Sequence, residues 1–333
     1  MNIIDIYHDE IPIFINELMR TKEMKRLKDV GMHCGCEYTN FPICRSLKKY
    51  SRFDHSVGVA LIVWHFTKDM KQSIAGLLHD ISTPTFAHVV DFLNNDYEKQ
   101  ESTEEKTYEM IINSNEIQCI LHKYNITTEE VSDYHRYPIA DNDAPKLAAD
   151  RLEYTLGNFY SRNLKTKTEI KRIYDNIEVL TNEFGEWELG FTNLSIAEEF
   201  SILSLDNSRY YVADEDRFAM QYLSDILHQA LEMKVITIND LYESETQVIN
   251  LLKSKDIINQ KWNTFINFTK IIRFDKKQDF YTVKINSKKR YINPLVINKR
   301  INELSITIKN EIASFLETEF NIWLSEESIV YHT

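Results

Sequence analysis

The stretch Ser51–Phe66, SRFDHSVGVALIVWHF, decides the fold. Ser51 and Asp54 match a capping box, in which side chains three positions apart satisfy backbone groups at a helix start. The apolar run that begins at Val57 follows directly. The sequence therefore predicts a buried helix that starts near Ser51 and carries His55 in its first turns.

A second stretch, Gly76–His88, reads GLLHDISTPTFAH. It places the polar pair His79-Asp80 at the end of a short apolar helix predicted over Ser73–His79. Thr83-Pro84 resembles another helix start, with the threonine as cap and the proline at the first helical position. We therefore expect His79-Asp80 to lie between two helices.

The composition indicates a mostly α protein. Gly (7) and Pro (6) are so rare among 333 residues that long helices are favoured over many strands and tight turns. The four cysteines form no convincing disulfide framework, and no apolar run reaches the roughly 20 residues that span a bilayer. We therefore expect a soluble, cytoplasmic protein that makes no membrane contact.

The chain divides into two predicted parts. Residues 1–165 are expected to form a helical core that carries the functional residues, and residues 166–333 a mostly helical C-terminal extension packed on it. Alternating residues in Phe280–Ile285 and Arg290–Ile292, with Asn286 at the break, predict a small β-hairpin in this extension.

Charge is unevenly distributed. The net charge of −12 disfavours non-specific binding to nucleic acid, yet the segment Lys253–Lys309 holds 14 Lys and Arg against 4 Asp and Glu. This segment is either a solvated lysine-rich face or a phosphate-binding surface. Nucleic-acid binding is therefore a possible but disfavoured function, and it predicts binding that weakens steeply with salt.

Four residues have the chemistry of metal ligands: His55, His79, Asp80 and Asp150. Divalent metals that activate water need nitrogen and oxygen ligands from several elements, with one position left open. Two imidazoles and two carboxylates form a moderately hard donor set that suits Mn, Fe, Mg or Ni and does not exclude Zn. The sequence therefore predicts one divalent metal ion.

Five ordered motifs extend this pattern. They are RFDHSVGVA (52–60), LLHDISTPTFAH (77–88), YEMIINSNEI (108–117), DRLEY (150–154) and KKRYINPLV (288–296). Together they resemble the HD-domain superfamily of metal-dependent phosphohydrolases, whose signature is H…HD…D on a helical bundle. Within it, they are most similar to the deoxynucleoside triphosphate triphosphohydrolases, the dGTPase-like group.

The resemblance implies roles for individual residues. It implies a metal held by His55, His79, Asp80 and Asp150, with catalytic contributions from Asp80, His88 and Glu101. It also implies substrate contacts: Arg52 with a phosphate, and Arg151 and Tyr154 with a phosphate or sugar. A homo-oligomer and a nucleotide or related phosphate-ester substrate are further expectations from the same source.

The chain departs from the group at two catalytic histidines. The HDxGH histidine position is Thr83, and the position of a later histidine is Gln100. General acid–base catalysis contributes about 10²–10⁴ in rate, so their loss predicts a weakened triphosphohydrolase. The alternative is a nucleotide-binding regulatory protein with weak or no hydrolysis. Asp29 falls where the group often has a glutamine that contacts the nucleoside, or it is an ordinary surface residue.

Overall fold

The protein is described by a computed structural model that covers residues 3–90 and 106–331. Its centre is α4 (Arg52–Thr67), 16 residues long, of which 11 are buried. Ser51 Oγ accepts from the backbone N–H of Asp54, and Asp54 accepts from the backbone N–H of Ser51. The predicted capping box is confirmed, and it fixes where α4 begins.

The helix α5 (Met70–Leu78) packs antiparallel to α4 after a short turn at Lys68 and Asp69. The Asp69 side chain caps it by accepting from the backbone N–H groups of Lys71 and Gln72. Gly76 lies where an added Cβ would be 3.0 Å from Val59, so its small size allows the two helices to approach closely.

Further helices and a small sheet surround this pair and share its hydrophobic core, forming what we call the first lobe. Its other helices are α1 (Ile4–Tyr7), α2 (Ile13–Leu18), α3 (Lys22–Arg26), η1 (Leu27–Asp29), α7 (Thr107–Asn113), α8 (Asn115–Lys123), η3 (Thr128–Glu130), η4 (Tyr134–Arg136), α9 (Ala149–Ser161), α10 (Lys167–Tyr174), α11 (Leu194–Tyr210), α15 (Ile301–Leu304) and α16 (Ile306–Leu316).

The sheet of the first lobe has the order β1-β2-β4-β5. Its strands are β1 (Ile177–Thr181), β2 (Trp187–Phe191), β4 (Leu295–Val296) and β5 (Lys299–Arg300). The β1–β2 pair is antiparallel, with Ile177 opposite Phe191, and β2 pairs with β4 in parallel. Gly185, at a φ of 80°, closes the turn between β1 and β2.

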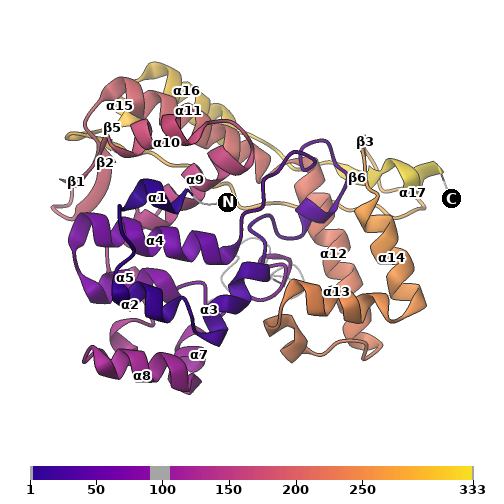
Figure 1. The fold of residues 1–333 in the computed structure, drawn as a ribbon. Helices are drawn as coiled ribbons and strands as arrows, with labels where there is room; N and C mark the ends of the chain where they lie inside the picture. The colour runs from indigo at the N-terminus through magenta and orange to yellow at the C-terminus, as the bar shows by residue number, and fades with distance from the viewer. Residues whose placement is uncertain (1–2, 91–105, 332–333) are drawn as a thin grey trace.

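A second group of elements lies beside the first and has its own hydrophobic core; we call it the second lobe (Figure 1). It consists of η2 (Cys36–Tyr38), α12 (Asp214–Glu232), η5 (Ile238–Tyr242), α13 (Glu245–Lys253), α14 (Asp256–Ile266), β3 (Ile271–Phe274), β6 (Trp323–Glu326) and α17 (Glu327–Tyr331). The chain crosses between the lobes several times. The predicted division at residues 165 and 166 stays a prediction.

The mostly α fold is confirmed, but the expected hairpin at Phe280–Ile285 and Arg290–Ile292 is wrong in position. Val283 instead exchanges backbone hydrogen bonds with Leu324 in the second lobe, at 2.9 and 2.7 Å. Ile292 is buried in the core of the first lobe. The two halves therefore pack in different cores, and the hairpin of this C-terminal region is β1–β2.

The helix start predicted at Thr83-Pro84 is also wrong. Residues Thr85–His88 form a turn, and Phe86 and Ala87 have positive φ values of 62° and 46°. The Thr83 hydroxyl donates to Asp80 Oδ1 at 2.7 Å rather than capping a helix. None of the helices in the described parts of the chain is long and apolar enough to cross a membrane.

Candidate metal centre

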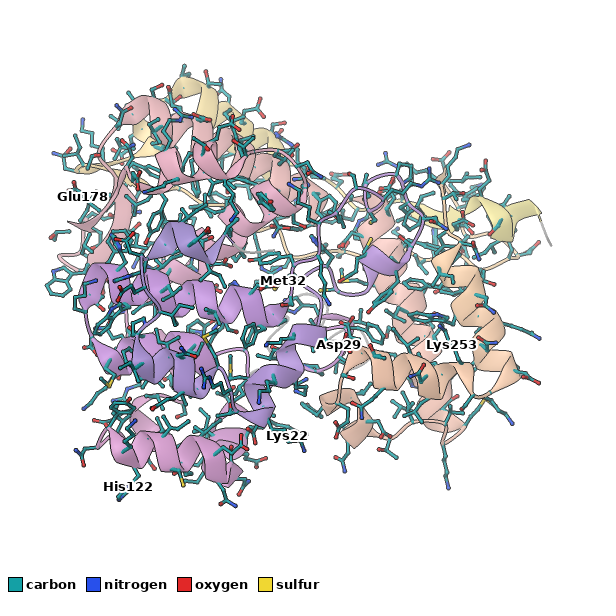
Figure 2. All side chains as sticks on the ribbon, viewed as in Figure 1. Lys22, Asp29, Met32, His122, Glu178 and Lys253 are labelled. Atoms are coloured by element: carbon teal, nitrogen blue, oxygen red, sulfur yellow. The ribbon has the colours of Figure 1, made fainter. Side chains whose placement is uncertain are left out.

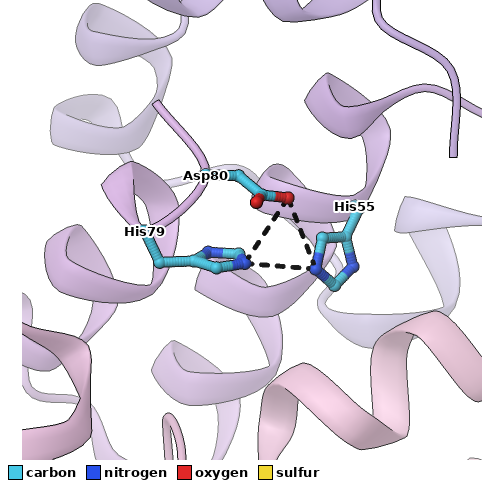
Figure 3. A group of neighbouring side chains, drawn as sticks. All are labelled: His55, His79 and Asp80. Carbon is cyan, nitrogen blue, oxygen red and sulfur yellow. Dashed lines mark hydrogen bonds and ion pairs between the residues drawn. The ribbon is translucent and has the colours of Figure 1, made fainter. Parts of the chain in front are cut away.

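The four predicted ligands come together from three helices. His55 lies in the first turn of α4, His79 and Asp80 directly follow α5, and Asp150 lies in the first turn of α9. His55 Nε2 lies 3.2 Å from His79 Nε2 and 3.0 Å from Asp150 Oδ1. Asp80 Oδ2 lies 3.9 Å from His55 Nε2 and 3.6 Å from His79 Nε2, as Figure 3 shows.

The hydrogen bonds behind the two imidazoles leave both Nε2 atoms as acceptors. His79 Nδ1 lies 2.7 Å from the carbonyl oxygen of Gly76, which can only accept, so Nδ1 carries the proton. His55 Nδ1 faces the Glu153 carboxylate at 2.7 Å in the same way. The two imidazole lone pairs and the Asp80 carboxylate therefore form a compact group that a divalent cation fits. Asp150 Oδ1 lies 3.0 Å from His55 Nε2 and 3.6 Å from His79 Nε2, at the edge of this group.

Glu153 is the residue behind His55 that the sequence did not reveal. It is fully buried and also accepts from the hydroxyls of Tyr7, at 3.2 Å, and of Tyr50. Gly58 on α4 gives it room, because a Cβ there would lie 2.6 Å from the Glu153 Cγ. These contacts orient the His55 ring, a role that outer partners of metal ligands commonly have.

The groups around the predicted ligands shift the pKa values of three of them. Burial lowers the pKa of His55, but hydrogen bonds to Asp150 and Glu153 outweigh it and raise that pKa to about 10. Burial raises the pKa of Asp150, yet the hydrogen bond from His55 brings it down to about 2. The positive charges of Arg52 and the two histidines overcome burial at Asp80 and hold its pKa well below the usual range.

Arg52 and Thr83 both bind Asp80. Arg52 Nη1 donates to Asp80 Oδ2 at 3.0 Å, while its buried Nε has no hydrogen-bond partner in the described parts of the chain. Thr83 occupies the other carboxylate oxygen through its hydroxyl. Arg52 therefore lies beside the metal ligands with donor capacity left over for an anion.

A cavity of about 600 Å³ opens onto these ligands and lies where the lobes meet. His88, Arg151 and Tyr154 line it, as predicted for residues near the site. Arg151 is already engaged: its Nη1 pairs with Asp141 at 3.0 Å and its Nε donates to the carbonyl of Lys146. Burial raises the pKa of Tyr154 to about 12, which keeps its hydroxyl protonated and able to donate.

His135 and Asp141, which the sequence did not reveal, also line the cavity. His135 Nε2 lies 3.4 Å from Asp141 Oδ2, and the neighbouring Tyr134 ring packs on His79 with centroids 4.8 Å apart. Tyr134, His135 and Asp141 fall outside the five ordered motifs, so no sequence pattern marked them.

Glu101 and Gln100 lie outside the described residues. Asp29 does not line the cavity: its Oδ2 accepts from the backbone N–H of Thr246 at 2.9 Å, in the first turn of α13. Figure 2 shows Asp29 and Met32 where the two lobes meet. Met32, three residues later, does line the cavity.

The basic segment Lys253–Lys309 is not one continuous free surface. Arg300 pairs with the buried Glu188 at 2.6 Å and with Glu183 at 2.7 Å. Lys270 pairs with Glu327 at 2.8 Å. In contrast, Lys288 and Arg290 line the cavity. Some of the basic residues of this segment therefore form ion pairs within the protein, and others line the cavity at the candidate site.

Comparisons with known proteins agree with these observations at a general level. No model of a known protein family matches the chain. It is 29% identical to the uncharacterized protein YdhJ of Bacillus subtilis over 89% of this chain and 88% of that protein. It is 27% identical to the metal-dependent phosphohydrolase cns2 of Cordyceps militaris over 46% of this chain and 43% of that protein.

Two solved structures have a similar fold. A phosphohydrolase from Bacteroides thetaiotaomicron matches with a TM-score of 0.62 and 13% identity, over 95% of this chain and 96% of that one. A hypothetical protein from Aquifex aeolicus matches with a TM-score of 0.61 and 18% identity, over 95% and 92% of the two chains. Two of these proteins are named phosphohydrolases, and none of the names refers to the dGTPase-like group.

Proposed function

We propose that this protein is a metal-dependent phosphohydrolase that acts on a nucleotide or a related phosphate ester, in the manner of the dNTP triphosphohydrolases. The observation that carries the proposal is the convergence of four acceptor side chains, His55, His79, Asp80 and Asp150, beside the buried Arg52. The name of the Cordyceps militaris relative supports the reaction class.

Each part of the site has a proposed task. A divalent ion supplies Lewis acidity, which lowers the pKa of water and polarises a phosphoryl oxygen. Arg52 binds phosphate oxygens through the donors that Asp80 leaves free. His88, which lines the cavity, is the proposed proton-transfer residue together with Glu101, because the Thr83 hydroxyl already donates to Asp80. Tyr154 and Arg151 are proposed substrate contacts.

The experiment combines elemental analysis with a product-resolved assay on one purified sample. We expect about one Mn, Fe, Mg, Ni or Zn ion per chain and release of phosphate or triphosphate from members of a panel of nucleotides and phosphodiesters. The paired change His79→Ala with Asp80→Ala should remove both metal and turnover. Metal-replete protein that releases neither product from any substrate in the panel would contradict the proposal.

A second candidate function is nucleotide binding for regulation, with weak or no hydrolysis. The hydrogen bond from Thr83 to Asp80 favours it, because this residue holds a ligand where the dGTPase-like group has a catalytic histidine. Nucleotide-dependent thermal stabilisation without product would support it. Turnover that disappears in the ligand variants would eliminate it.

Assembly and location remain part of the proposal. The resemblance implies a homo-oligomer in the cytoplasm, and light scattering of the purified chain tests the first of these. Nucleic-acid binding through Lys253–Lys309 is retained only as a disfavoured function. Binding that does not weaken as salt rises would end it.

A further inference from the structure

Two buried cysteines face each other in the second lobe, apart from the metal centre. Cys36 is the first residue of η2, and Cys44 packs in the same hydrophobic core. Their Sγ atoms lie 3.0 Å apart, although the residues are separated by eight positions in the chain. A disulfide bond is about 2.0 Å long, so the two sulfur atoms are about 1 Å from bonding distance. The pair therefore needs little movement to become covalent.

The backbone between the two cysteines is already folded into turns that bring the side chains together. The backbone N–H of Thr39 donates to the carbonyl of Cys36 at 3.0 Å, and the Thr39 hydroxyl donates to the same oxygen at 2.7 Å. The backbone N–H of Cys44 donates to the carbonyl of Phe41 at 2.9 Å. Because the loop holds this closed shape without a cross-link, forming the bond costs little conformational entropy.

The two thiols differ in exposure and in hydrogen bonding. Cys44 is 5% exposed, whereas Cys36 is fully buried. The Tyr210 hydroxyl lies 3.8 Å from Cys44 Sγ, and burial raises the pKa of Tyr210, so this hydroxyl keeps its proton and donates. The hydrogen bond from Cys36 lowers the pKa of Cys44, with Tyr210 adding to this effect and burial opposing it. Cys44 is therefore the sulfur that more readily becomes a nucleophilic thiolate.

Tyr210 connects the thiol pair to the cavity. Its side chain lines the cavity, and so do His33 and Cys34 from the segment that leads into η2. The His33 ring packs edge-on against the Tyr210 ring, with centroids 6.1 Å apart. The thiol of Cys44 therefore lies one side chain behind the cavity wall, where a small polar oxidant can approach it.

We propose that Cys36 and Cys44 form a reversible redox site, which a hydroperoxide such as hydrogen peroxide converts into a disulfide. The Cys44 thiolate attacks a peroxide oxygen and the O–O bond breaks; the departing hydroxide takes up the Cys44 thiol proton, which leaves a sulfenic acid and one water. Cys36 Sγ then attacks Cys44 Sγ and the S–O bond breaks, and this second hydroxide takes up the Cys36 thiol proton. Two thiols and one peroxide thus become one disulfide and two waters, with two electrons passing from sulfur to oxygen.

The short loop makes this disulfide reversible. The stabilisation that a cross-link supplies grows with the number of residues in the closed loop, and only eight positions separate the two cysteines. A dithiol reductant restores both thiols by exchange and is itself oxidised to a disulfide. The inference does not rest on the proposed phosphohydrolase function, because neither thiol is a proposed metal ligand or substrate contact.

The test treats the full-length protein with stoichiometric hydrogen peroxide and counts the free thiols after denaturation. We expect the count to fall from four to two and to return to four with dithiothreitol. A trypsin digest leaves three cysteines in the peptide Asp29–Arg45, so a second cleavage after Glu37 separates Cys44 from the other two. Fragment masses should then show the Cys36–Cys44 link. The Tm of the oxidised protein should exceed that of the reduced protein by about 5 °C.

Single substitutions separate a reactive pair from ordinary apolar packing. Cys36→Ala should leave Cys44 as a sulfenic acid that dimedone captures, because the second sulfur is absent. Cys44→Ala should keep all its remaining thiols. The matched control is Cys119→Ala, which removes an exposed cysteine on α8 and should still lose two thiols to peroxide.

Three results would overturn the proposal. They are a wild-type protein that keeps four thiols, a link that joins Cys34 or Cys119 in place of the proposed pair, and a Cys44→Ala protein that loses thiols as the wild type does. Circular dichroism checks that each variant folds. If Cys36→Ala does not fold, the thiol count and the mapped link in the wild-type protein decide the question without it.

Discussion

Glu153 and Asp216 are two buried carboxyl groups with opposite surroundings. Glu153 receives hydrogen bonds from His55, Tyr50 and Tyr7, whereas Asp216 receives none from the described residues. Burial raises the pKa of both. The difference teaches that full partnering fixes a side chain in place, as Glu153 fixes the ring of the proposed ligand His55, while a carboxyl without such partners beside a cavity is available to a ligand.

The largest effect is expected from removing Asp150, at the end of the cavity where Glu153 contacts His55. Asp150→Ala should abolish bound metal and turnover, because it removes one of the four converging acceptors and the partner of His55 Nε2 at 3.0 Å. Elemental analysis and product release are the measurements. Asp133→Ala, an exposed acid near the cavity rim, should retain both, and retention of metal in Asp150→Ala would contradict the ligand assignment.

A second prediction concerns Glu153 itself. Glu153→Gln replaces one carboxylate oxygen by an amide in a site that presents three donors, so His55 loses its orientation. Metal Kd should rise by about 10–100-fold, as measured by competition with a metal indicator. Tyr7→Phe, which leaves the His55 contact at 2.7 Å in place, should have a smaller effect. An unchanged Kd in Glu153→Gln would show that His55 needs no such partner.

The equivalent change at Asp216, Asp216→Asn, should stabilise the folded protein at alkaline pH. The pKa of Asp216 is raised on folding, so its favourable contribution is complete below about pH 4 and is lost as pH rises toward the folded value. Asp216→Asn should therefore raise the Tm by a few degrees at pH 8, since about 1 kcal/mol shifts Tm by 2–4 °C in larger domains. The gain should shrink at pH 4, and a Tm that falls at pH 8 would mean that Asp216 is paired.

The smallest effect is expected at a third carboxyl, Glu37, which extends the comparison to like-charged neighbours. Burial and the adjacent Glu245 raise the pKa of Glu37 to about 8. Its stabilising contribution is therefore present below about pH 4.5 and lost as pH rises through 8. Glu37→Gln should raise the Tm by a degree or two above pH 8 and have little effect at pH 4.5. A pH-independent difference between the proteins would contradict this.

Local sequence was enough to predict the start of α4, and the ordered motifs marked four side chains that lie together in the fold. The capping box at Ser51 depends on residues three positions apart, and the ligands were recognised from His55, His79-Asp80 and Asp150 in order. The conformation of Thr83-Pro84, which does not begin a helix, was not predictable in this way. The Thr83 hydroxyl donates to Asp80, and the Thr85 backbone N–H bonds the carbonyl of Leu241 in the other lobe.

The sequence by itself determined the mostly helical class, because helix-favouring composition and apolar spacing are short-range patterns. Its ordered motifs also marked four side chains that the fold brings together, and their role as metal ligands stays a prediction. Only the tertiary structure decided which carboxyls are partnered, as Glu153 is, and which face the cavity, as Asp216 does. Only the tertiary structure also decided that Val283 packs in the core of the second lobe and Ile292 in the core of the first. These outcomes depend on burial between segments far apart in the chain, and no local pattern encodes that competition.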